Sequence, residues 1–166
     1  MKKLIVLALL ATLAGGAYAS SVAVPWFTDF AGEAATGGDY PPSVAGLFGL
    51  KSSTYVTLKN NTEDALMCEI IYTDKVGTDM TPAVNTFTIA AQAAIGFRPY
   101  RDDNTEAPAG LVPNCTVVEP WTLGSVLPAG SAKVSFVGDP KDVQGMVTMY
   151  DTTLNASSSY LLPEGK

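Results

Sequence analysis

Short strand-like segments, each bounded by turn residues, constrain this chain more than any other feature. In the clearest, Ala65–Thr73 (ALMCEIIYT), alternate residues from Leu66 to Tyr72 would share one face of a strand and those from Met67 to Thr73 the other. Further strands are predicted at 54–59, 85–90, 94–98, 132–137, 143–150 and 158–162. Turn residues separate these segments, and no sustained helical stripe follows the first residues. The pattern predicts an all-β fold, a sandwich or a barrel.

The first nineteen residues have the three parts of an export signal. Lys2 and Lys3 precede the uncharged apolar run Leu4–Ala14, and Ala17-Tyr18-Ala19 follows as a small-x-small cleavage motif. The alternatives are a buried helix or a membrane anchor, but spanning a bilayer takes about 20 apolar residues. We expect a signal peptide cleaved after Ala19 and no transmembrane segment in the mature chain. The protein would be secreted to the exterior, the cell surface or the periplasm.

Residues 20–50 are expected to form an N-terminal strand and a Gly/Pro-rich linker, followed by a β-sandwich domain at 51–166. Val22, Val24 and Trp26 alternate with small or polar residues, as in a half-buried strand. Pro25 limits this strand to a sheet edge or to an added strand, because proline donates no ladder hydrogen bond. A strand on a long linker also suggests strand exchange through Val22, Val24, Trp26 and Phe27. The simpler expectation is that it packs on its own sheet.

Charge and missing residue types exclude several functions. Loss of the signal lysines leaves eight basic against sixteen acidic residues, a net charge of −8, which opposes nucleic-acid binding. The absence of histidine excludes Ser-His-Asp and Cys-His catalysis and the usual zinc hydrolase sites. Neither a G-x-S-x-G elbow nor a glycine-rich phosphate loop is present. We expect no enzymatic activity and no cofactor. A catalytic pair of carboxylates is the exception that the sequence does not exclude, because two acids that meet in space need no fixed spacing along the chain.

Cys68 and Cys115 are the two cysteines of the chain. An even number of cysteines in an exported protein predicts a disulfide. The alternative is two buried thiols. A zinc site is not expected, since two cysteines without histidine fall short of four ligands.

Two loops contain candidate ligand contacts. Oxygen-bearing Asp102, Asn104 and Glu106 alternate as calcium ligands do, but Ala107 replaces the glycine that a calcium loop needs. We therefore expect a solvated turn there and no metal. Trp121 is a candidate contact for a glycan, with a role in capping the core as the alternative.

The stretch Tyr55–Pro99 resembles the secreted immunoglobulin-like or fibronectin-like β-sandwich modules of bacterial surface proteins. The resemblance rests on VTLKNNT, CEIIYTDKVG and NTFTIAAQAAIGFRP, which share the succession of strand and turn types. It implies an immunoglobulin-like antiparallel β-sandwich at the cell surface, and it implies no activity. The chain departs from the antibody pattern, since Trp26 and Trp121 both lie outside the Cys68–Cys115 interval.

Two functions are consistent with these features. The first is a structural or assembly subunit of the bacterial cell surface or an extracellular fibre, which would self-associate or bind other envelope proteins. The second is an extracellular or periplasmic binding module for a glycan or an envelope protein, since loops on a rigid sandwich commonly carry recognition.

Overall fold

A computed structural model describes residues 20–28, 52–100, 111–116, 129–151 and 156–165. The strands are β1 (Ser20–Thr28), β2 (Ser52–Asn60), β3 (Leu66–Asp74), β4 (Thr86–Ile89), β5 (Ala94–Phe97), β6 (Ala129–Phe136), β7 (Val143–Asp151), β8 (Ala156–Leu161) and β9 (Glu164–Gly165). A 3-10 helix, η1 (Pro140–Asp142), joins β6 to β7. The predicted all-β class is confirmed. Among the described residues, no helix has the length and apolar character needed to cross a bilayer.

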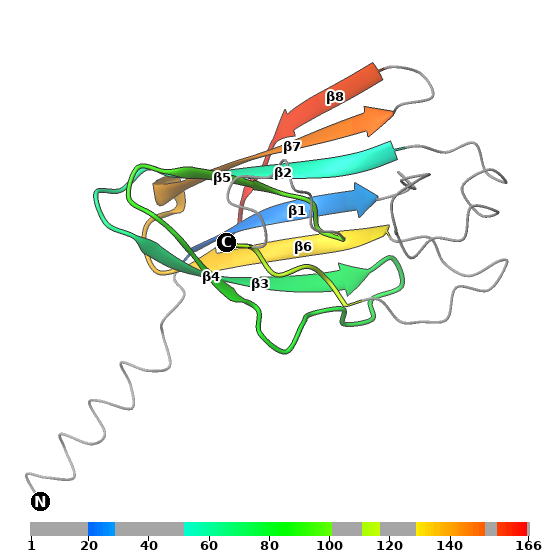
Figure 1. Cartoon of the computed structure of the whole chain (residues 1–166), viewed down its shortest axis with the longest axis horizontal. Coiled ribbons are helices and arrows are strands. Elements are labelled where there is room, and N and C mark those ends of the chain that lie inside the picture. The colour runs from blue at the N-terminus through cyan, green and yellow to red at the C-terminus, as the bar shows by residue number, and fades with distance from the viewer. Residues whose placement is uncertain (1–19, 29–51, 101–110, 117–128, 152–155, 166) are drawn as a thin grey trace, which may run out of the picture.

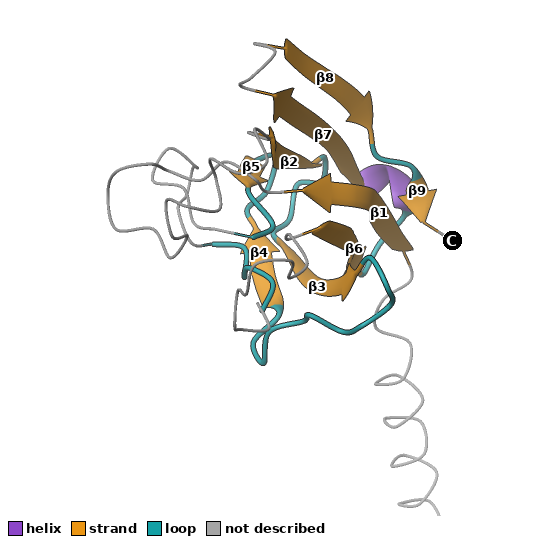
Figure 2. Ribbon diagram, turned by 90° about the vertical axis from the view of Figure 1, so that its right-hand side faces the viewer, coloured by secondary structure: helices purple, strands orange, loops and turns teal. Residues whose placement is uncertain are grey.

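The strands form two antiparallel sheets that pack face to face (Figures 1 and 2). One has the order β4-β3-β6-β1-β9, and the other has the order β5-β2-β7-β8. The core between them is built from the inward-facing residues of each strand, as the period-two pattern predicts. On β3, Cys68, Ile70 and Tyr72 are fully buried, whereas Ile71 is 40% exposed on the outer face.

β1 departs from the predicted alternation at Pro25. Val24 pairs with Ala132 of β6 and Phe27 pairs with Gly130, so three steps along β1 match two along β6. Beyond this β-bulge, the alternation of inward-facing and outward-facing side chains is reversed. Phe27 therefore enters the core, and Trp26 is 42% exposed. The prediction that Trp26 shares the buried face with Val22 and Val24 is wrong for this reason.

The predicted edge position of β1 is corrected in part. β1 has neighbours on both sides, since it lies between β6 and the two-residue β9. β9 pairs only with Ser21 and Val22. Pro25 lies beyond the end of β9 and within the bulge, where a missing N–H breaks no ladder.

The turn after β2 is held by the buried amide of Asn60. Its Nδ2 donates to the carbonyl oxygens of Asp64 at 2.8 Å, Ile89 at 3.2 Å and Ala90 at 3.0 Å. Its Oδ1 accepts from the backbone N–H of Thr62 at 2.8 Å and from the Thr62 hydroxyl at 2.9 Å. Because Asn60 is 0% exposed, these groups have no access to water as a substitute. One side chain thus joins the β2–β3 turn to the end of β4.

Replacing Asn60 by alanine is expected to lower the free energy of unfolding by about 3 kcal/mol, because one buried and four part-buried hydrogen bonds are lost. Asn61→Ala is the matched control, since the Asn61 amide donates at an exposed position to the Lys141 carbonyl. The control should cost less than about 1 kcal/mol. Denaturant titration of both variants measures the difference, and equal losses would refute the role given to Asn60.

Candidate functional site

β1 supplies a large part of the core although it is distant in sequence from the other strands. Val22, Val24 and Phe27 are 1%, 0% and 0% exposed. The Phe27 ring packs edge-to-face on Tyr72 of β3, with centroids 6.0 Å apart and planes at 87°. Edge-to-face contact is a favoured aromatic geometry. Three of the four residues predicted for strand exchange therefore lie in the core, and Trp26 does not.

Backbone pairing holds β1 mainly on its β6 side. Seven residue pairs link β1 to β6, from Ser20 opposite Phe136 to Thr28 opposite Ala129. On the other side, the N–H of Ala23 lies 3.4 Å from the Pro163 carbonyl, just before β9. The N–H of Thr28 donates to the Thr54 hydroxyl of β2 at 3.0 Å. β1 thus bridges the two sheets at the end where it leaves the core.

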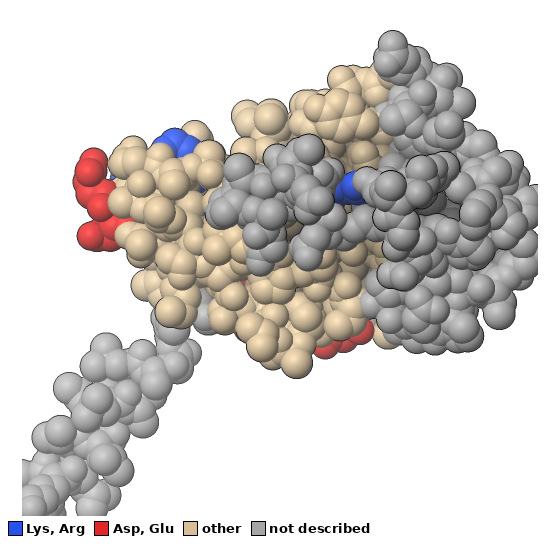
Figure 3. Space-filling view, in the orientation of Figure 1, with Lys and Arg blue, Asp and Glu red and all other residues tan. Residues whose placement is uncertain are grey.

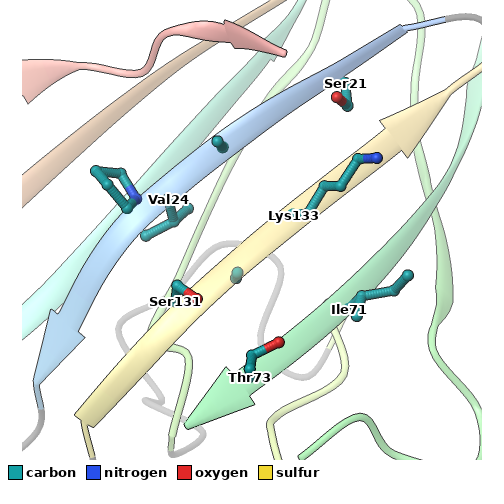
Figure 4. A pocket seen from close by; sticks show the side chains of 9 residues that line it. Ser21, Val24, Ile71, Thr73, Ser131 and Lys133 are labelled. Carbon is teal, nitrogen blue, oxygen red and sulfur yellow. The ribbon is translucent and has the colours of Figure 1, made fainter. Parts of the chain in front are cut away.

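A shallow groove runs over the outer face of β1, β6 and β3 (Figure 4). Its volume is about 450 Å³. Its lining residues are Ser21, Ala23, Val24, Pro25, Ile71, Thr73, Ser131, Ala132 and Lys133. Most of these side chains are small, so the groove exists because neighbouring positions on three strands carry little bulk.

The groove combines short apolar surface, hydroxyl groups and one cation. Lys133 is exposed and directly opposes Ala23 on one side and Ile71 on the other. No described acidic side chain forms a salt bridge with Lys133. The arrangement suits an extended ligand with an anionic group, held by hydrogen bonds to Ser131 and Thr73.

The expected Cys68–Cys115 disulfide is not present, and both residues are buried thiols. Cys68 lies opposite Phe136, at the end of the sandwich where β1 begins. The segment that contains Cys115 lies near Tyr72, because the Tyr72 hydroxyl donates to the Pro113 carbonyl at 2.8 Å. Tyr72 is four residues from Cys68 along β3, which is about 13 Å of strand. The Cys115 segment is thus anchored through Tyr72, whereas Cys68 lies nearer the start of β3.

Burial determines the chemistry of Cys68. Its side chain is 0% exposed, and desolvation raises the pKa of the thiol from 9.0 to about 12. The thiolate is the nucleophilic form. Cys68 is therefore inert in the folded protein at neutral pH and acts as a small apolar core residue.

The other predicted contacts lie outside the described residues. These are Trp121 and the calcium candidates Asp102, Asn104 and Glu106. Within the described ranges, no group of three His, Cys, Asp or Glu side chains is arranged to hold a metal ion. The groove was missed by sequence reasoning, since it depends on strand order and not on any local motif.

No family model matches the chain, and no curated protein or solved structure matches it either. The residues and their geometry are thus the basis for a functional proposal.

Cys68 is expected to resist a thiol reagent such as dithionitrobenzoate until the protein unfolds. With a pKa of about 12, its thiolate fraction at pH 8 is about 10⁻⁴, against about 0.1 for a thiol with a pKa of 9.0. Reactivity in the native state should rise with pH, because the thiolate forms only as the pH approaches the raised pKa.

The Cys115→Ala variant isolates Cys68 in this experiment. It should yield one reactive thiol in guanidinium chloride and almost none when native. The wild-type protein should yield two thiols in guanidinium chloride. A denatured wild-type protein with no reactive thiol would show that the cysteines are oxidised and would contradict the reduced, separated arrangement.

Proposed function

We propose that this chain is an exported, non-catalytic structural or assembly subunit of the bacterial cell surface or of an extracellular fibre. The single observation that carries the proposal is the position of β1. This strand completes the core, yet 23 residues, 29–51, separate it in sequence from β2. Export is supported by the signal-like residues 1–19, and the non-catalytic role by the absence of histidine from the chain.

Exchange of β1 between copies is the proposed mode of assembly. Burial of a Val or Phe side chain stabilises by about 1.5–3 kcal/mol, so Val22, Val24 and Phe27 together make the position beside β6 a strong binding site for a strand. These contacts are the same whether β1 comes from its own chain or from a second copy. An extended chain reaches at most roughly 3.3–3.6 Å per residue, so a connection of 23 residues can span roughly 80 Å. This reach is far more than the width of one sheet.

We also propose that the sandwich is of the immunoglobulin-like type. In that type, strands B, E and D are neighbours in one sheet and strands G, F and C in the other. The spatial orders β1-β6-β3 and β8-β7-β2 match this arrangement when β1, β2, β3, β6, β7 and β8 are taken as B to G in chain order. In this assignment, the A position beside β1 is occupied by the two-residue β9. Such a fold supports a scaffold role without implying an activity.

A second candidate function is a binding module for a glycan or an envelope protein. The groove over β1, β6 and β3 favours it, since Lys133, Ser131 and Thr73 offer a cation and hydroxyl groups beside apolar surface. Trp121 stays a candidate ligand contact in this alternative. A binding module would be monomeric alone, whereas an assembly subunit would form oligomers.

A cysteine pair across β1 and β6 tests strand exchange. Ala23 and Lys133 are directly opposed on the outer face. Their Cα atoms in such a pair are about 4.5–5.5 Å apart, within the range of a disulfide. In the mature Ala23→Cys/Lys133→Cys protein, refolded at high concentration and oxidised, we expect covalent oligomers on a non-reducing gel. Light scattering and negative-stain microscopy of the wild-type protein should show regular oligomers or filaments.

The single variants Ala23→Cys and Lys133→Cys are the controls, because neither can close the β1–β6 bond. If oxidation of the double variant produced only an internally linked monomer at every concentration, β1 would remain on its own sheet and exchange would be refuted. A wild-type protein that stays monomeric and binds a glycan or an envelope protein would favour the binding module instead.

A further inference from the structure

β8 is the longest edge strand among the described residues. It has six residues, against four each in β4 and β5 and two in β9. One side pairs with β7 from Asp151 opposite Ala156 to Met146 opposite Leu161, and no described strand pairs with the other side. Both ribbon views place β8 at the margin of the molecule, beyond β7 (Figures 1 and 2). All its residues except Tyr160 are exposed.

The sequence of β8 lacks the devices that protect an edge. Its residues, ASSSYL, contain no charge, no proline and no glycine, and its pairing with β7 has no bulge. Soluble proteins usually block such edges with lysine, proline or a bulge. Uncharged surface covers this part of the molecule in the space-filling view (Figure 3). A regular, uncharged edge is suited to pairing with another strand.

The open edge presents backbone groups at alternate residues. The N–H of Leu162 donates to the Gly145 carbonyl at 2.8 Å, next to the pair Met146–Leu161. In an antiparallel ladder this bond makes Met146–Leu161 a non-hydrogen-bonded pair. Ser157, Ser159 and Leu161 therefore point their N–H and C=O groups away from β7, toward the open edge.

These groups are self-complementary about Ser159. A second β8 placed antiparallel on a two-fold axis at Ser159 sets Ser159 opposite its own copy and Ser157 opposite Leu161. Ser158 then lies opposite Tyr160 on the inner face, so each large side chain meets a small one. The three outward residues of each copy would form roughly six ladder hydrogen bonds. No like charges meet, although the whole chain carries a net charge of −6.

We propose that two copies of this chain pair through β8 in this register, which joins their four-stranded sheets into one continuous antiparallel sheet. Leu161, 78% exposed, would be partly covered by the second copy. This inference rests on the assembly role proposed above and adds a second contact to it, made by β8 and not by β1.

Ser159→Lys tests the pairing in the mature protein. It sets two ammonium groups opposite each other across the two-fold axis, at Cα atoms about 5.5 Å apart. We expect the dissociation constant of the pair to rise at least tenfold, measured by sedimentation velocity over a concentration series. Thr88→Lys is the matched control, because it adds the same charge to β4, an exposed edge strand of the other sheet. Thr148→Val removes the 2.9 Å bond between the Thr148 and Ser159 hydroxyls without adding charge, and it should leave the pairing intact.

Ser159→Cys gives a direct readout of the register. Two copies should be linked by a disulfide under mild oxidation, since the paired Cα atoms would fall within about 4.4–6.8 Å. Thr88→Cys should not be linked. If wild-type oligomers formed equally with Ser159→Lys and Ser159→Cys gave no more dimer than Thr88→Cys, pairing through β8 would be refuted and the assembly role would stand. A wild-type protein that stays monomeric at all concentrations would refute both.

Discussion

The rest of the sandwich depends on β1, which pairs with β6 along its backbone and buries one face in the core between the two sheets. The apolar side chains of β1 lie in this core, and Phe27 reaches Tyr72 two strands away. Removal of β1 would leave the edge of β6 unpaired and would remove the ring that packs on Tyr72. The bulge at Pro25 and Trp26 makes this contact possible, because it allows both Val24 and Phe27 to point inward. A proline that would disrupt a regular ladder therefore increases the burial that the strand provides.

Sequence periodicity predicted much of the strand content, since alternation reports directly which residues face a core. It placed Cys68, Ile70 and Tyr72 on one face of the β3 strand, and the structure shows that this face is buried. It failed at Trp26, because a bulge has no fixed signature in a single sequence and reverses every later side chain. Pairing of Cys68 with Cys115 failed for a different reason. An even number of cysteines does not show whether the fold brings them close enough to bond.

The groove could not have been predicted, because its lining comes from β1, β3 and β6, which are neighbours only in the folded sheet. The self-complementary edge of β8 was equally hidden. The sequence predicts a strand near 158–162, but only the pairing with β7 shows which backbone groups point outward. The proposed contacts also differ in symmetry. A β8 pair is isologous and closes on itself, whereas strand exchange can continue from copy to copy. Together they would produce a paired fibre, whereas strand exchange alone would produce a single fibre and β8 pairing alone a dimer.

A short connection joins β8, which would form one of these contacts, to β9, which pairs with the strand that would form the other. Only Leu162 and Pro163 separate the strands, yet β8 belongs to one sheet and β9 pairs with β1 in the other. The Leu162 side chain lies over Gly145, where even a methyl group would overlap it. The connection between β8 and β9 is therefore both short and closely packed against β7. By thermodynamic reciprocity, any change that β1 exchange makes to the affinity of β8 pairing must act with the same factor in reverse. If β1 exchange strengthened β8 pairing through this connection, assembly would be cooperative, with a sharp concentration threshold in place of gradual growth.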